Sequence, residues 1–384
     1  MTDRNFDILR DFTSLLKMMV RKDASDLFVT AGLPPSLKIN GHIAPVSEAP
    51  LNADAVRKLA NSIMNETQRE EFERTQECNF AIAPPDTGRF RVNVFQQKNH
   101  AGIVLRRIKT EIPSFEELGI PKVLEDLSML KRGLVIIVGA TGTGKSSTLA
   151  AMIGHRNRHS DGHIISVEDP IEYVHEHDGC IITQREVGVD TESFEAALRN
   201  TLRQAPDVIL IGEVRTRETM EHAIAFAETG HLCVTTLHAN NANQALDRIL
   251  NFFPKDRRDQ ILLDLSLNLR AIVGQQLIPA PDKQGRVVAV EILMNTPLVA
   301  QMIRDGNVAS LKEVMSKSNQ QGMNTFDQAL YELYKNHKIT YEDALHHADS
   351  ANELRLMIKL GQKAGLKKME ASLNGVTLVN IDDT

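Results

Sequence analysis

One short segment combines glycines, a lysine and a hydroxyl group at the spacing that binds phosphate. Residues 139–146 match G-x-x-x-x-G-K-[ST], after the apolar run LVIIV and before the helical segment SSTLAAMI. Glycines let backbone N–H groups turn towards a phosphate, and the following helix adds its positive dipole end. We expect Lys145 to reach the β- and γ-phosphates of ATP and Ser146 to ligate Mg²⁺. The alternative is a Gly/Thr-rich turn that binds nothing. The expected binding residues are Gly139, Ala140, Thr141, Gly142, Thr143, Gly144, Lys145, Ser146 and Ser147.

Hydrolysis of a bound nucleotide also needs a carboxylate that holds the metal or orients the attacking water. Asp207 and Glu213 stand at the two ends of the apolar segment DVILIGE. A strand of this length separates them by about 20 Å, so both cannot serve one metal ion. Ligands of open α/β sheets bind at the carboxyl ends of the strands, which favours Glu213 as metal ligand and base. The alternative is a carboxylate that is merely paired with Arg215.

Three further acids, Glu168, Asp169 and Glu172, end the segment IISVEDPIE. Carboxylates this close repel one another unless a cation or a basic side chain compensates their charge. Because they follow a predicted strand, we expect them to face the same nucleotide crevice. The alternative is a solvated acidic turn.

Two histidines flank another predicted strand in the segment HLCVTTLH. His231 and His238 are seven residues apart, so their rings face opposite sides of an extended strand. His238 follows the carboxyl end and could contact a γ-phosphate or its water, whereas His231 is expected to be structural. The alternative for His238 is also a structural role. The remaining histidines lack HExxH or paired Cys/His spacing and predict no separate metal site.

Four arginines lie on two neighbouring predicted strands, RFRVNVFQQ and AGIVLRRI: Arg89, Arg91, Arg106 and Arg107. An arginine that reaches a γ-phosphate can increase the rate of hydrolysis by about 10³–10⁵. The alternative is a basic sheet edge that discourages strand pairing.

The order of predicted elements divides the chain into parts that could position these groups. The pattern over residues 1–110 predicts a small α+β domain that starts with an amphipathic helix over 1–20. The pattern over 111–130 predicts an interdomain linker. From 131 to 365, apolar strands alternate with helices, which predicts an α/β, doubly wound, mostly parallel sheet followed by a largely helical part. A strand pair is expected near 277–278 and 287–293. Residues 366–384 predict a polar, flexible tail.

Composition excludes several classes of protein. The 384 residues carry a formal net charge of −6, no Trp and only 4% aromatic residues, which disfavours a nonspecific nucleic-acid binder. The three cysteines form no CxxC pair, and no apolar run approaches the length of a membrane span. We therefore expect a soluble cytoplasmic protein with no membrane span and no nucleic-acid partner.

The motifs taken together resemble the PilT/GspE family of secretion ATPases. The segments GATGTGKSS, VEDPIEYVH, LRQAPDVILIGEVR and TGHLCVTTLHANNA occur in the order and at the intervals of that family. RFRVNVF and GMNTFDQAL extend the resemblance over nearly the whole chain. Ala205 and Thr216 depart from the pattern of the main retraction motors and favour the accessory branch of pilus-retraction ATPases.

The resemblance implies a hexameric ATPase at the cytoplasmic, inner-membrane base of a type IV pilus, which powers or assists pilus retraction and twitching motility. Each subunit would join a PAS-like domain to a RecA-like P-loop domain. The implied partners are further copies of the chain, a PilT-type companion ATPase and a membrane platform protein of the pilus. The implied catalytic residues are Glu213, Glu172, His238, Arg91 and Arg106, with Ser146 and Glu213 at the metal; the resemblance assigns no role to Arg107.

Three other functions remain as alternatives. One is an accessory ring subunit that binds nucleotide but does not need its own turnover. Another is a RecA-type nucleic-acid translocase, which the acidic charge and the scarcity of aromatic residues disfavour. The last is a pilus-assembly motor, but such motors carry a longer N-terminal region and a tetracysteine zinc element.

Overall fold

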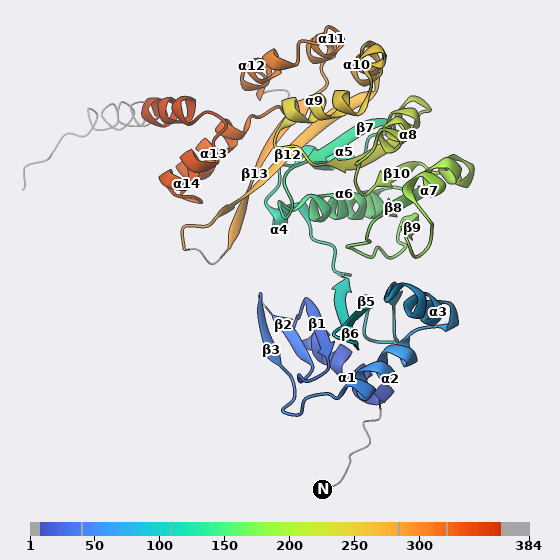
Figure 1. The fold of residues 1–384 in the computed structure, drawn as a ribbon. Helices are drawn as coiled ribbons and strands as arrows, with labels where there is room; N and C mark the ends of the chain where they lie inside the picture. The colour runs from blue at the N-terminus through green and yellow to red at the C-terminus, as the bar shows by residue number, and fades with distance from the viewer. Residues whose placement is uncertain (1–7, 40, 109, 283–284, 320–321, 362–384) are drawn as a thin grey trace, which may run out of the picture. The chain divides into compact units, whose positions relative to one another are not determined.

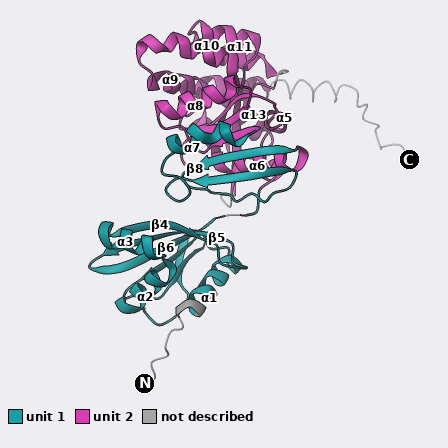
Figure 2. Ribbon diagram, turned by 90° about the vertical axis from the view of Figure 1, so that its right-hand side faces the viewer, with its two compact units in different colours: residues 1–112, 161–206 teal, residues 113–160, 207–384 magenta. Residues whose placement is uncertain are grey.

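The computed structural model describes residues 8–39, 41–108, 110–282, 285–319 and 322–361. It separates into two compact units, Met1–Ile112 with Asp161–Pro206, and Pro113–Ser160 with Asp207–Thr384 (Figure 2). Each unit is described by itself below. The proposed boundaries at 110, 130 and 365 stay predictions, and the tail predicted over 366–384 lies outside the described residues.

The N-terminal part of the chain forms a six-stranded antiparallel sheet with three helices (Figure 1). Its strands follow the order β3-β2-β1-β6-β5-β4. Helix α1 supplies the buried side chains Phe12, Leu16 and Met19, as the predicted amphipathic helix requires. The elements are α1 (Ile8–Arg21), β1 (Asp26–Thr30), β2 (Ser36–Ile39), β3 (His42–Pro45), α2 (Ala53–Ile63), α3 (Glu66–Thr75), β4 (Glu77–Ile82), β5 (Arg89–Gln97) and β6 (His100–Ile108).

Strands β5 and β6 form the predicted hairpin. Phe90, Val92 and Val94 are fully buried and alternate with partly exposed polar residues, so one face of β5 packs on the core. Lys98 and Asn99 make the bend, both with positive φ. The alternative of a basic sheet edge is wrong, because β5 and β6 are inner strands between β1 and β4.

The second sheet has seven strands in the order β13-β12-β7-β11-β10-β8-β9. The pairs β7–β11, β10–β11, β7–β12 and β8–β9 are parallel, and β13 runs antiparallel to β12. All residues of β7, β10 and β11 are buried, which explains their continuous apolar sequences. The strands are β7 (Gly133–Val138), β8 (Gly162–Glu168), β9 (Cys180–Glu186), β10 (Val208–Ile211), β11 (Leu232–Leu237), β12 (Leu269–Pro279) and β13 (Arg286–Met294).

Helices follow most of these strands, and more helices follow β13 in the described residues. Helices α6 and α8 contact β7 and β11, and α9 contacts β12 and β13 (Figure 1). The longer helices are α6 (Lys145–His159), α7 (Phe194–Thr201), α8 (Arg217–Glu228), α9 (Ala242–Phe252), α10 (Arg258–Asn268) and α11 (Pro297–Arg304). Helices α12 (Leu311–Lys317), α13 (Phe326–Lys335) and α14 (Tyr341–His347) follow.

The segment that precedes the second sheet contains two short helices, α4 (Phe115–Leu118) and α5 (Val123–Ser128). Phe115 is buried and meets the ring of His155 edge-on at 5.5 Å between centroids. The guanidinium of Arg156 donates to the carbonyl oxygens of Ser128 and Leu130 at 3.1 and 2.7 Å. These contacts fasten the segment to helix α6.

No helix in the described part of the chain has both the length and the apolar character to cross a membrane.

Candidate nucleotide-binding and hydrolysis site

The glycine-rich loop connects β7 to α6, as the sequence predicts. Gly144 precedes α6 with φ 90°, a conformation that favours glycine, and no side chain caps the first turn of the helix. That turn therefore presents backbone N–H groups and a positive dipole end to an anion. At Gly139, a Cβ atom would lie 2.7 Å from the carbonyl oxygen of Gln275, so only glycine fits where the loop passes β12.

Lys145 is held inside this loop. Its side chain is buried, and Nζ donates to the carbonyl oxygens of Gly139 and Ala140, both at 2.9 Å. A buried ammonium group is stable only with such acceptors. The hydroxyl of Thr143 also donates to the carbonyl of Ala140, at 2.9 Å. The loop thus positions a cation before any phosphate binds.

Glu213 follows the carboxyl end of β10 and contacts two side chains. Oε2 accepts hydrogen bonds from Arg215 at 2.9 Å, and Oε1 lies 3.0 Å from Nε2 of His238. The backbone N–H of Val214 donates to the carbonyl of Thr236, which ties this loop to β11. Glu213 therefore follows the strand end and is also paired with Arg215, and its role as metal ligand and base stays a prediction.

His238 stands after β11, next to the same carboxylate. Burial and the nearby ammonium of Lys145 lower the pKa of His238, while the charge of Glu213 opposes that shift. The ring is therefore neutral at neutral pH, and an Nε2–H tautomer can donate to Glu213. The second unit thus brings Lys145, Glu213 and His238 together.

His231, at the other end of β11, has local partners. Its Nδ1 lies 3.0 Å from the hydroxyl of Thr229 and 3.3 Å from the carbonyl of Phe226. These contacts close the turn between α8 and β11. They agree with the structural role expected from the sequence.

The acidic segment belongs to the other unit. Glu168 ends β8, and its Oε1 accepts from the hydroxyl of Ser166 at 2.7 Å and from the amide of Gln184 at 3.2 Å. Burial raises the pKa of Glu168 to about 7, these hydrogen bonds oppose the shift, and the acids Glu172 and Glu186 add to it. Glu172 itself is exposed to solvent.

The arginines occupy one region of the six-stranded sheet. Arg91 and Arg106 are direct partners across β5 and β6. Nε of Arg106 lies 2.9 Å from Oδ1 of the buried Asp26, and Arg107 lies 2.9 Å from Asp23. Arg106 and Arg107 thus hold acids within their own domain. The action of Arg91 and Arg106 on a phosphate stays a prediction.

Two polar side chains inside the second sheet were not singled out from the sequence. Gln275 of β12 donates to the hydroxyl of Thr148 in α6 at 2.8 Å, and both side chains are buried. Glu291 of β13 accepts from the backbone N–H of Ala242 at 2.8 Å. The available signal was a polar residue inside an apolar run, in AIVGQQLI and in VVAVEILM.

Comparisons with known proteins agree with this site. The model of the family described as "Type II/IV secretion system protein" matches residues 3–379. The chain is 62% identical to the type IV pilus ATPase PilU of Pseudomonas aeruginosa over 97% of this chain and 98% of that protein. It is 40% identical to the type IV pilus retraction ATPase PilT of Pseudomonas aeruginosa over 88% of this chain and 98% of that protein.

A solved structure gives the same result for the fold. The pilus retraction motor PilT with bound ADP aligns with a TM-score of 0.83 and 40% identity, over 89% of this chain and 98% of that one. The second sheet therefore belongs to a RecA-like P-loop domain. The smaller PAS-like α+β domain precedes it in the chain. The protein is a P-loop ATPase that binds ATP and ADP.

These findings confirm the resemblance expected from the motifs, including the similarity to PilU. The site and the matches agree on a type IV pilus ATPase. The chain belongs to the type II/IV secretion system protein family, that is, to the PilT/GspE secretion ATPases.

Proposed function

We propose that the protein is a hexameric cytoplasmic ATPase, placed at the inner-membrane base of a type IV pilus, that hydrolyses MgATP to power or assist pilus retraction. The observation that carries this proposal is the grouping of Lys145, Glu213 and His238 around the phosphate-binding loop. It occurs in a chain that is 62% identical to the type IV pilus ATPase PilU. Twitching motility would be the cellular consequence.

In this proposal the loop from Gly139 to Ser147 binds the phosphates of ATP. Lys145 leaves the carbonyl oxygens of Gly139 and Ala140 and neutralises the β- and γ-phosphates. Glu213 orients and deprotonates the attacking water while Arg215 and His238 hold its two oxygens. The water oxygen bonds to the γ-phosphorus, and the bond from that phosphorus to the β,γ-bridging oxygen breaks. The products are phosphate and ADP.

Mg²⁺ fits the oxygen donors of this site. Ser146 lies in the first turn of α6 and Glu213 follows β10, which supplies a hydroxyl and a carboxylate. Mg²⁺ takes one or two protein oxygens beside substrate phosphates. Within the described residues, no cluster of three or more His, Cys, Asp or Glu side chains could hold a metal ion alone. A metal ion bound together with the nucleotide would neutralise the developing phosphate charge.

Glu172, Arg91 and Arg106 complete the proposed catalytic set. Glu172 is exposed, so a bound substrate can reach its carboxylate. Arg91 and Arg106 lie opposite each other on inner strands, which makes them one rigid pair of cations. Domain movement would bring that pair to a γ-phosphate, either within a subunit or between neighbours of the ring. Hydrolysis would then be coupled to motion.

The second candidate is an accessory ring subunit that modulates a PilT-type companion motor without its own turnover. The specific observation that favours it is the 62% identity to PilU beside only 40% to PilT. In both cases the partners are further copies of the chain, the companion ATPase and a membrane platform protein of the pilus.

Pilus retraction in cells separates the two candidates. A strain that lacks the protein receives either the wild-type chain or Lys145→Ala, first with an active companion motor and then with an ATPase-dead one. A force-producing ATPase restores retraction beside the dead motor, and Lys145→Ala does not. If wild-type protein fails beside the dead motor while Lys145→Ala supports the active one, the accessory function is correct.

A further inference from the structure

The loop that carries His238 is fixed mainly at the start of helix α9. The side chain of Asn241 caps the helix by accepting from the N–H of Gln244 at 3.0 Å. The side chain of Gln244 in turn accepts from the N–H of Asn240 at 3.2 Å. The N–H of Ala242 does not use this local cap and donates instead to Glu291, 49 residues further along the chain.

Glu291 is an unusual residue for its position. It projects from the middle of β13, its exposed fraction is 2%, and its neighbours Val290 and Ile292 are buried apolar residues. A carboxylate inside a sheet costs free energy unless it makes a specific bond. Burial raises the pKa of Glu291 to about 7, and the hydrogen bond from Ala242 opposes that shift.

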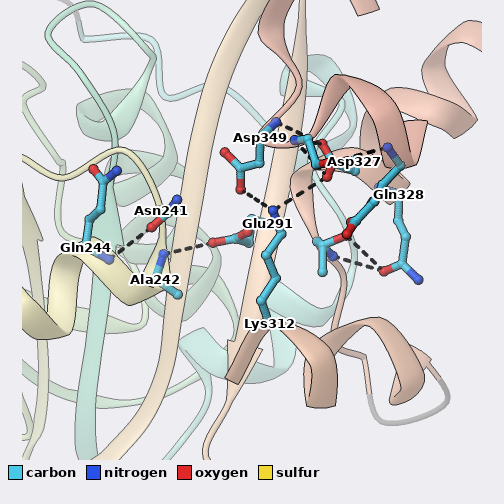
Figure 3. A network of polar contacts seen from close by, with 11 residues as sticks. Asn241, Ala242, Gln244, Glu291, Lys312, Asp327, Gln328 and Asp349 are labelled. Carbon is cyan, nitrogen blue, oxygen red and sulfur yellow. Dashed lines mark hydrogen bonds and ion pairs between the residues drawn. The ribbon is translucent and has the colours of Figure 1, made fainter. Parts of the chain in front are cut away.

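The surroundings of Glu291 come from the C-terminal helices. Figure 3 shows Lys312 reaching from α12 towards Asp327 and Asp349, beside Glu291. Nζ of Lys312 lies 3.5 Å from Asp327 and 2.9 Å from Asp349. Asp327 also accepts from the N–H groups of Asp349 and Ser350. This network holds α12, α13 and the segment after α14 together.

The backbone beside Glu291 is also tightly packed. A Cβ atom at Gly274 of β12 would lie 3.0 Å from the ring of Phe326 and 3.4 Å from Cβ of Glu291. Phe326 begins α13 and is fully buried. The main chain of β13 can therefore move little, and the position of the Glu291 carboxylate is well determined.

We infer that Glu291 is a positioning residue for ATP hydrolysis: by binding the first N–H of α9 it holds the loop that places His238 against Glu213. This inference rests on the proposed role of His238 in the reaction. His238 lies four residues before Ala242, so a shift at the start of α9 displaces its ring relative to a carboxylate 3.0 Å away. Glu291 acts on this pair through the loop, by way of its bond to the N–H of Ala242.

Two substitutions separate the hydrogen bond from the shape of the side chain. Glu291→Gln keeps an oxygen that can accept from Ala242, whereas Glu291→Leu has a similar size and no acceptor. Leu330→Ala is the matched control, because Leu330 is fully buried in α13 among the C-terminal apolar residues, and its truncation loosens these helices. All variants are compared as full-length protein at a temperature below their unfolding.

Steady-state phosphate release tests the inference. We expect Glu291→Leu to lower kcat by about tenfold or more with KM for ATP within about twofold, and Glu291→Gln to restore most of the turnover. In a His238→Ala background, Glu291→Leu should change kcat by less than about twofold, since both act on one contact. Leu330→Ala should lower the unfolding temperature with a smaller change in kcat.

Several results would overturn the inference: wild-type turnover in Glu291→Leu, an equal loss in Leu330→Ala, or an effect of Glu291→Leu that multiplies with that of His238→Ala. The proposed function is tested separately in the same assay. If wild-type turnover survives in Lys145→Ala, the proposed site itself is wrong. If Lys145→Ala abolishes turnover and Glu291→Leu does not change it, only the inference about Glu291 fails.

Discussion

Glu213 follows the parallel strand β10 and Glu168 is the last residue of the parallel strand β8, yet the two acids have different surroundings. Glu213, whose side chain is 18% exposed, contacts the guanidinium of Arg215 and the ring of His238. The side chain of Glu168 accepts hydrogen bonds from the neutral groups of Ser166 and Gln184. A cation stabilises a carboxylate, whereas burial and neighbouring acids favour its protonated form.

The difference shows that a strand end determines where an acid lies, and its neighbours determine its charge. Burial raises the pKa of Glu168 to about 7, so near neutral pH a large fraction of this side chain carries a proton. A base for water must be charged when substrate binds. The comparison therefore favours Glu213 for proton removal, and it favours a supporting role for Glu168 between β8 and β9.

The largest expected effect comes from loss of Lys145, whose charge acts on His238, the partner of Glu213. Lys145→Ala removes the ammonium that would neutralise the phosphates, so we expect ATP turnover to fall by more than about 100-fold. The same change removes a cause of the lowered pKa of His238, which should rise. Phosphate release and an NMR titration of His238 measure the two effects. Full turnover would contradict the assignment of the loop.

Glu168→Gln tests the other side of the comparison. A folded-state pKa above the ordinary value means that the folded protein binds more protons than the unfolded chain between about pH 4.5 and 7. The free energy of unfolding therefore decreases as the pH rises through that window, by up to about 3 kcal/mol for this group. The amide lacks this titration, so the difference in unfolding temperature between pH 5 and pH 8 should shrink. An unchanged difference would show that Glu168 is charged.

His238→Ala should have an intermediate effect. The ring supports one oxygen of Glu213 through a neutral hydrogen bond, and its loss should reduce turnover by about tenfold with little change in ATP affinity. Steady-state kinetics provides the test. A loss as large as that of Lys145→Ala would mean that the ring contacts the phosphate itself.

Arg215→Ala should have the smallest effect. The side chain of Arg215 is 58% exposed, and such ion pairs contribute about 0–1 kcal/mol. Turnover should fall by no more than about fivefold, and the unfolding temperature should change little. A loss of 100-fold, on the order expected for a group at the reacting phosphate, would instead place Arg215 in the reaction.

The sequence predicted the phosphate-binding loop, the parallel sheet and the position of Glu213, because each depends on local spacing and on apolar runs of strand length. It could not choose between the two interpretations of Glu213, since the contact with His238 joins residues that follow two different strands. The raised pKa of Glu168 depends on burial and on the charge of Glu186, which lies opposite it only when β8 and β9 pair. Glu291 contacts a residue 49 positions away, so no local pattern contains that bond.

The most direct test of the account compares MgATP hydrolysis by wild-type protein, Glu213→Gln and Glu168→Gln, with nucleotide binding measured independently. If Glu213 is the base, Glu213→Gln should bind ATP within about threefold of wild type and hydrolyse it about 10²–10⁴-fold more slowly. Glu168→Gln should retain turnover within about tenfold, as a supporting residue does. Near-normal hydrolysis by Glu213→Gln, or a larger loss in Glu168→Gln, would contradict the account.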